Sequence, residues 1–245
     1  MPGLGTLINV TLITIGGLIG LAASSLVTER LQDALLRACG ACIVFVGIAG
    51  TLQHMLVATV AEDGAVLLST TGTMMLVVSM ALGTVIGEVI DIDARFDDLG
   101  KWLRDHTGSS GDPRFVDGFV TASLTLSVGA MAIVGSIQDG LAGDWSALAL
   151  KGSIDAIIVC AMAASMGKGC IFSALSVGVF QGLVTALATL IAPVLSDAAL
   201  ANLTLVGSVL IFCVGINLIW PRTFKPANML PAVVIAAVCA GLPWF

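Results

Sequence analysis

The sequence predicts an all-α polytopic membrane protein with about eight transmembrane helices. Composition is the first observation: the 245-residue chain is 58% hydrophobic and only 11% charged. Its mean hydropathy of +1.07 is far above the range of soluble domains. The second observation is that eight apolar segments each reach the ~20 residues that a spanning helix needs. They cover residues 1–28, 38–61, 64–87, 118–138, 145–167, 169–196, 198–221 and 226–245.

The first and fifth segments need separate justification as spans. The first lacks the basic residues that precede the apolar core of a signal peptide, so we interpret it as a spanning helix. The fifth, unlike the other seven, contains charged residues, Lys151 and Asp155. We include it because its omission would scatter the basic loops over both sides of the membrane.

The Lys and Arg residues predict the orientation, because short cytoplasmic loops accumulate positive charge. With eight spans, nine of the ten basic residues fall in loops on one side, and Lys151 is the exception. We therefore expect a multi-pass protein with both termini outside. The nine residues on the inside are Arg30, Arg37, Arg95, Lys101, Arg104, Arg114, Lys168, Arg222 and Lys225.

A short amphipathic helix is expected on the cytoplasmic surface between the third and fourth spans. Its apolar residues recur every three or four positions, so one face is apolar. They are Ile92, Phe96, Leu99 and Leu103. A helix of this kind lies on the membrane surface. A polar linker, residues 107–113, follows it.

An internal repeat is the third observation behind the fold prediction. Residues 17–26 resemble 182–191, residues 43–48 resemble 211–216, and Met75-Leu76 resembles Met229-Leu230. The counterparts are five spans apart, an odd number, so the second copy is inverted in the membrane, as in many secondary transporters. Chance similarity between apolar helices is the alternative. The single transmembrane domain, residues 1–245, then comprises repeat one (1–90), the cytoplasmic helix and linker (91–113), a central hairpin (116–167) and repeat two (169–245).

Lys151 and Asp155 are the main candidates for a functional site. They lie one helical turn apart on the same helix face. Counting ~1.5 Å per residue from Trp145, Asp155 lies ~15 Å into a hydrocarbon core of ~30 Å. Charged groups at that depth are costly and are functional by default. The structural alternative is a buried pair that only fixes the helix register.

The second group of candidates is a glycine-rich stretch of the hairpin. Residues 135–140, GSIQDG, are expected to form a polar turn between its two apolar segments, with Ser136, Gln138 and Asp139 as binding groups. Glycines at 129, 135 and 140 would let the backbone leave the helix and offer carbonyl oxygens to an ion.

Two amides complete the predicted site. Asn9 lies inside the first span and Gln181 inside the sixth. An amide that faces lipid loses its hydrogen bonds, so both side chains must face protein or a cavity. Interhelical hydrogen bonding explains them as well as ligand binding does. We expect both amides to face Asp155.

The sequence contains no signature of an enzyme. It lacks the Gly-x-x-x-x-Gly-Lys-Ser/Thr loop of nucleotide hydrolysis, and His54 and His106 fall at opposite membrane faces. Cys39 and Cys42 lie within an apolar helix, where they act as small hydrophobic residues. No basic patch for nucleic acid is present. We therefore expect no enzymatic activity, no metal site and no cofactor other than a coupling cation of unknown identity.

Several stretches resemble the YqgA/YdfK family, bacterial inner-membrane proteins that share a domain of unknown function (DUF554). They are residues 4–9, 118–124, 129–140, 151–155 and 181–182, of which GSIQDG is the most specific. The resemblance spans nearly the whole chain. It implies a polytopic protein of the bacterial inner membrane and brings no substrate.

These features predict a secondary transporter or facilitator of a small polar solute or ion, working in the lipid bilayer as a homodimer. The alternative is a structural or regulatory membrane protein in which the polar hairpin mediates assembly, and an ion channel comes third. A transporter needs a water route to Asp155 and a bound ligand, whereas an assembly protein has these groups fully paired. A channel needs a continuous pore lined by polar rings.

Overall fold

The computed structural model describes residues 2–24, 28–60, 66–109, 111–127, 130–191, 196–221 and 223–241. Over these ranges nearly all of the regular structure is helical, and the exception is a β-hairpin, β1 (Leu56–Val60) and β2 (Val66–Thr70). The prediction of an all-α polytopic membrane protein is therefore confirmed apart from this hairpin.

Six of the described helices are long and apolar enough to cross a membrane. They are α1 (Leu4–Ser24), α2 (Glu29–Met55), α3 (Thr73–Ile90), α7 (Ser146–Met166), α8 (Gly169–Ala186) and α10 (Asp197–Ile219). The fourth expected span is broken: α5 (Phe115–Ser127) and α6 (Ala130–Ala142) meet at a bend of 64°. The last expected span holds α11 (Pro226–Met229) and α12 (Pro231–Cys239), which are shorter than a bilayer core requires. The count of eight spans stays a prediction.

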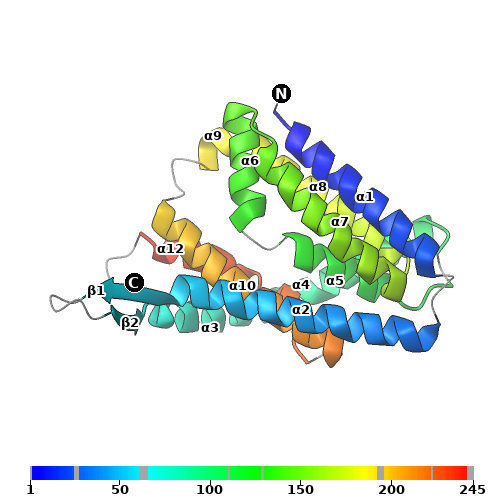
Figure 1. Cartoon of the computed structure of the whole chain (residues 1–245), viewed down its shortest axis with the longest axis horizontal. Helices are drawn as coiled ribbons and strands as arrows, with labels where there is room; N and C mark the ends of the chain where they lie inside the picture. Colours follow the sequence, from blue (N-terminus) through cyan, green and yellow to red (C-terminus); the bar gives the residue numbers. More distant parts are fainter. Residues whose placement is uncertain are drawn as a thin grey trace.

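The spanning helices form two groups, each with its own hydrophobic core (Figure 1). In one group, α1, α5, α7 and α8 pack around buried residues such as Ile13, Val159 and Val177, with α6 against α7 and α8. In the other, α3, α10 and α12 pack around Met75 and Val206, with α2 along α10. Residues of α2 and α10 also enter the first core, which joins the two groups.

Helix α1 packs along α7 at very short range, and glycines make this possible. A Cβ atom on Gly20 would lie 2.1 Å from the carbonyl oxygen of Cys160, and one on Gly16 would lie 2.3 Å from that of Ala156. In lipid, where packing rather than water exclusion drives helix association, small residues let two backbones approach closely. Figure 1 shows the two helices side by side along their length.

The helices expected to be repeat counterparts pack against each other as three antiparallel pairs: α1 with α8, α2 with α10, and α3 with α12. In the second pair, Gly47 faces Phe212 and Gly215 faces Val44. Any antiparallel pair has local twofold symmetry, but here the two contacts are exchanged by the offset of 168 residues between the similar segments, which relates Gly47 to Gly215 and Val44 to Phe212. This arrangement agrees with an inverted repeat, which stays a prediction.

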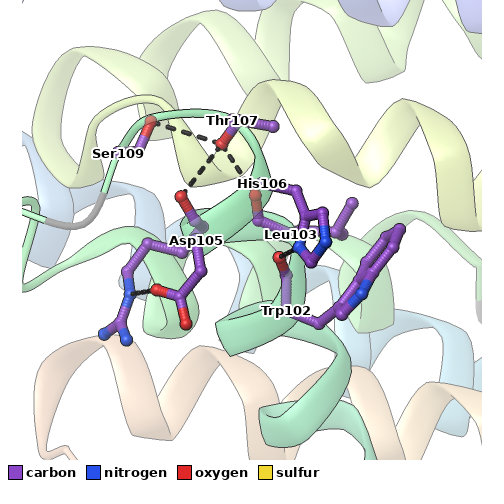
Figure 2. A network of polar contacts seen from close by, with 7 residues as sticks. Trp102, Leu103, Asp105, His106, Thr107 and Ser109 are labelled. Atoms are coloured by element: carbon purple, nitrogen blue, oxygen red, sulfur yellow. Dashed lines mark hydrogen bonds and ion pairs between the residues drawn. The ribbon is translucent and has the colours of Figure 1, made fainter.

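The amphipathic helix is present as α4 (Ile92–His106). Leu103 is buried with Phe115 and Phe119 of α5, whereas Leu99 and Trp102 are exposed. Side chains satisfy its last carbonyl groups: the Thr107 hydroxyl donates to the carbonyl oxygens of Leu103 (2.8 Å) and Arg104 (3.3 Å). Figure 2 shows this network, in which His106 Nδ1 also contacts the Trp102 carbonyl oxygen. These hydrogen bonds satisfy carbonyl groups of the last turn and so stabilise the end of the helix at residue 106.

Three expectations are corrected. Segment 38–61 does not stay helical to its end, because α2 stops at Met55 and β1 follows. Segment 64–87 is not helical at its start, because it contains β2 and α3 begins only at Thr73. Residues 135–140 do not form a turn: they lie inside α6. The connection to α7 lies at residues 143–145 instead, where Gly143 has a φ of 68° and Ser146 N donates to Asp144 Oδ1.

Candidate functional site

Lys151 and Asp155 lie on the buried face of α7 and form a direct ion pair. Their residues are only 7% and 5% exposed. The spacing of four along one helix places them on the same face, as expected from the sequence. With α7 beginning at Ser146, Asp155 lies nine residues, or ~14 Å, into the helix. The sequence therefore predicted the pairing and the place of Asp155 near the middle of the helix, whereas its depth in the membrane stays a prediction.

The Lys151 ammonium group also contacts the broken helix. Its Nζ donates to the backbone carbonyl oxygen of Leu126 at 2.9 Å. Leu126 lies in the last turn of α5, where carbonyl groups have no intrahelical donor and carry the negative end of the helix dipole. The bend after Ser127 thus leaves the Leu126 carbonyl oxygen free to accept a hydrogen bond, and Lys151 donates that bond. Gly129, expected to break the helix here, lies outside the described residues.

Asn9 and Gln181 meet beside the ion pair. Asn9 Nδ2 donates to Gln181 Oε1 at 3.1 Å, and the Asn9 amide also interacts with the Asp155 carboxylate. Both amide residues are fully buried, yet Asn9 Oδ1 and Gln181 Nε2 have no partner. If both amides were rotated, one oxygen and one amino group would still lack a partner. The cluster of Asn9, Lys151, Asp155 and Gln181 therefore has unused binding capacity.

Asp139 takes a different role from the one predicted. Its Oδ2 accepts the backbone N–H groups of Gly3 (3.1 Å) and Gly5 (3.0 Å). The carboxylate therefore caps the start of α1, where the helix dipole favours negative charge. Its Oδ1 is buried and has no partner. Gly5 precedes Asn9 by one turn, so Asp139 lies ~6 Å along α1 from the cluster.

The other two predicted residues of the glycine-rich stretch are not hydrogen-bonded to the cluster. Ser136 is fully buried, but its hydroxyl donates to the Ala132 carbonyl oxygen of its own helix at 2.6 Å. Gln138 is exposed, and its carbonyl oxygen accepts the N–H of Asp144. Both placements follow from residues 135–140 being helical: successive side chains point in different directions, and only some can face the protein interior.

A cavity of about 630 Å³ opens where several helix ends meet. We call it the acidic cavity after four of its lining residues, Asp33, Asp93, Asp97 and Asp117. Arg114 and Lys225 line it too, and Arg114 donates to the Ser165 carbonyl oxygen at 3.1 Å. Burial raises the pKa of the Asp93 carboxyl, and the neighbouring Asp97 adds to this effect, while Lys225 opposes it. The segments that meet here are those predicted to be cytoplasmic.

A second cavity of about 300 Å³ lies beside the helix break. Its lining is mostly apolar and comes from both helix groups, with three hydroxyl groups, those of Ser123, Ser127 and Ser176. Ser123 and Ser176 are hydrogen-bonded to each other at 3.0 Å. Among the described residues, Lys151 and Asp155 line neither this cavity nor the acidic cavity. Neither of these two cavities therefore opens directly onto the ion pair.

Two parts of the site were not predicted. The Leu126 carbonyl group belongs to the backbone, and it is free to accept a hydrogen bond from Lys151 only because the helix bends after Ser127. No single residue type predicts such a bend, and Gly129 was the one sequence feature that suggested it. The acidic cavity gathers carboxylates from three helices, α2, α4 and α5, and a sequence does not show which helix ends converge. Their shared charge and shared predicted side were the available signals.

Comparisons with known proteins find one family and two relatives that match nearly the whole chain. The model of the family described as "Protein of unknown function (DUF554)" matches residues 4–240. The chain is 26% identical over 234 residues to the uncharacterized membrane protein YdfK of Bacillus subtilis (strain 168), covering 96% of this chain and 94% of that protein. It is 23% identical over 248 aligned positions to the uncharacterized protein YqgA of Escherichia coli (strain K12), covering 99% of each. No solved structure matches the chain.

Proposed function

We propose that this chain, which belongs to the DUF554 family of proteins of unknown function, transports a small polar solute or ion across the bacterial inner membrane. One observation carries the proposal: a buried ion pair, Lys151 and Asp155, is held against the open end of broken helix α5 near the middle of α7. Broken helices whose ends face polar groups at this depth are typical of the binding sites of secondary transporters.

Energetic cost supports a functional role for the pair. Moving a charged group out of water costs several kcal/mol, and one ion pair compensates this only with further hydrogen bonds. Here Lys151 gains such a bond from Leu126, but the neighbouring amides of Asn9 and Gln181 keep one unpaired oxygen and one unpaired amino group. An unpaired buried polar group costs about 1–3 kcal/mol. A bound polar ligand would remove this cost.

The arrangement of the helices also favours transport. Three antiparallel pairs of predicted counterparts, α1 with α8, α2 with α10 and α3 with α12, are what an inverted repeat would produce. Inverted repeats let one half of a transporter move against the other around a fixed central site. In this proposal the buried cluster represents an occluded conformation, and the acidic cavity is the approach to it from the cytoplasmic side.

An assembly protein is the second candidate. It is favoured by the direct contact between Lys151 and Asp155 and by their low exposure, since a purely structural pair needs no route to water. The two functions differ in what the carboxylate must do. A transporter needs its charge, whereas an assembly protein needs mainly its hydrogen bonds and shape.

The proposal extends to the setting of the protein. We place it in the inner membrane with both termini outside, as a homodimer, without enzymatic activity and without a cofactor apart from a coupling cation. The β-hairpin supports self-association: β1 and β2 contain no Asp, Glu, Lys or Arg, and Val66, Leu67 and Leu68 are exposed. Open, uncharged strand edges pair readily with a second copy.

The test is solute uptake into proteoliposomes by the wild-type protein and by Asp155→Asn, which keeps the shape of the side chain and removes its charge. We expect Asp155→Asn to lose at least about tenfold in uptake rate while remaining folded. Asp155→Leu serves as the comparison, because it removes both charge and hydrogen bonds. If Asp155→Asn transports normally and only Asp155→Leu is unstable, the pair is structural and the assembly function is correct.

A further inference from the structure

We propose that the Lys151 ammonium occupies a binding site for a monovalent cation, and that a transported cation takes its place between the Asp155 carboxylate and the Leu126 carbonyl oxygen. The inference rests on the proposed transport function and gives it a substrate class. No bond is made or broken: the cation and the ammonium exchange the same two acceptors.

The first argument is the chemistry around Lys151 Nζ. Its two partners are a carboxylate and a carbonyl oxygen at the negative end of a half-helix. Carbonyl oxygens and helix C-terminal ends of this kind coordinate alkali cations in channels and transporters. The Lys151 ammonium group therefore takes the position that a bound metal cation would have between these two oxygens.

The second argument is charge. Asp155 supplies one negative charge at the cluster, and Lys151 neutralises it. One carboxylate balances one monovalent cation, so the entering ion can replace the ammonium without leaving a net charge in the membrane. An anion suits the site less, because it would approach the Asp155 carboxylate, and two of the three ammonium hydrogens of Lys151 are already engaged.

The third argument is the capacity that Lys151 leaves unused. The unpaired amide oxygen in the cluster, Asn9 Oδ1 as the amides are assigned, comes from a side chain that is fully buried and interacts with Asp155. A spherical cation accepts ligands from any direction, whereas an ammonium offers only three hydrogens. A metal cation can thus take this third oxygen as well. The long stem of Lys151 lets its head group move toward the outer membrane face when displaced.

The acidic cavity supplies an approach for such a cation. Asp117, Thr121 and Leu124 line it along one face of α5, at spacings of four and three. Leu124 precedes Leu126 by two residues, or ~3 Å along the helix axis. A recess rich in carboxylates raises the local concentration of cations. Along the axis of α5, the lining of the cavity therefore ends within one helical turn of the Leu126 carbonyl group, to which Lys151 donates.

The first experiment measures uptake of radiolabelled sodium and rubidium into proteoliposomes. Lys151→Met removes the internal competitor, so we expect the half-saturating cation concentration to fall at least about tenfold, since a like charge a few ångströms away is strongly repulsive. Lys168→Met is the matched control, because Lys168 is exposed at the start of α8. It should behave like the wild type.

The second experiment needs no variant, so it stands even if Lys151→Met does not fold. The wild-type protein is reductively methylated in sodium, rubidium or choline buffer, and peptides are quantified by mass spectrometry. Displacement should raise methylation of Lys151 at least about threefold in sodium or rubidium relative to choline, while exposed Lys101 and Lys225 stay unchanged.

The outcomes separate the inference from the transport function. Uptake of sodium or rubidium with an unchanged half-saturating concentration in Lys151→Met would show transport without competition and overturn the inference alone. Cation-dependent methylation without uptake would keep the cation site and overturn transport. Methylation that does not respond to either cation overturns the competition between Lys151 and a bound cation, whatever the uptake result.

Discussion

Individual side chains in this protein show how depth decides the role of a charge. Asp155 is buried and directly paired, and Asp139 is buried and caps the start of α1. Asp93, by contrast, lies at the start of α4 beside other carboxylates of the acidic cavity. Burial and the neighbouring Asp97 raise the pKa of Asp93 above its ordinary value of 3.8. Its negative form is therefore disfavoured in the folded protein.

This shift predicts a pH-dependent effect of Asp93→Asn. A raised carboxyl pKa means that the folded chain binds the proton more tightly than the unfolded chain. The contribution of Asp93 to stability is then fully present below 3.8 and is lost as the pH rises through the raised pKa. Asp93→Asn should melt at a higher temperature than the wild type at pH 7, and the gain should shrink as the pH falls toward 3.8. Thermal melting in detergent measures both.

The control for this prediction is Asp98→Asn, since Asp98 is an exposed neighbour on the same helix that pairs with Lys101. Its melting temperature should follow that of the wild type at each pH. A gain for Asp93→Asn that is equally large in acid would point to packing rather than charge as the cause.

Among the helices, the close contact of α1 with α7 is the feature on which the site depends, because it places Asn9 beside Gly152 and Asp155. We predict that Gly20→Ala destabilises the protein by ~1–3 kcal/mol, since the added Cβ would overlap the Cys160 carbonyl oxygen and push the helices apart. Gly182→Ala on α8 is the matched control, because nothing lies within 4 Å of its Cβ position. Equal stability of the two variants, measured by unfolding in detergent, would contradict the packing argument.

The helices were predictable from the sequence where one signal dominated. Long apolar runs located α1, α7 and α10 to within a few residues at both ends, and α3 and α8 at one end only, because the runs 64–87 and 169–196 extend well beyond those helices. Periodic apolar residues located α4. The Lys151–Asp155 pair and its two amides were predictable, because a charged or amide side chain in an apolar span must face the protein interior and find a polar partner there.

The missed features have physical reasons. The β-hairpin went unnoticed because Leu56–Val60 and Val66–Thr70 are apolar and continue the helical runs, so hydrophobicity alone cannot separate strand from helix there. Residues 135–140 suggested a turn because glycine and polar residues break helices in water. In α6, close packing of Gly135 on Leu148 and of Gly140 on Thr185 explains the glycines instead. Tertiary contacts therefore overrode local propensity.

Across the whole molecule, the two ends of the helix bundle differ in chemistry. One end carries the acidic cavity, where the starts of α2, α4 and α5 and the ends of α7 and α10 come together. These are the segments that hold the basic residues assigned to the cytoplasm, although Arg222 lies outside the described residues. The opposite end holds the start of α1, capped by Asp139, and the loop that contains Asp144.

The convergence of these loops makes the topology testable with two single cysteines. Asp144→Cys and Asp98→Cys, both at exposed positions, are placed in a protein whose six native cysteines are replaced by alanine. A membrane-impermeant maleimide is then added to intact cells. Because basic loops stay in the cytoplasm, we expect Asp144→Cys to react at once and Asp98→Cys to react only after permeabilisation. If only Asp98→Cys reacts in intact cells, the orientation is the opposite of the predicted one and the acidic cavity faces the outside. If both cysteines react in intact cells, residues 98 and 144 do not lie on opposite sides of the membrane.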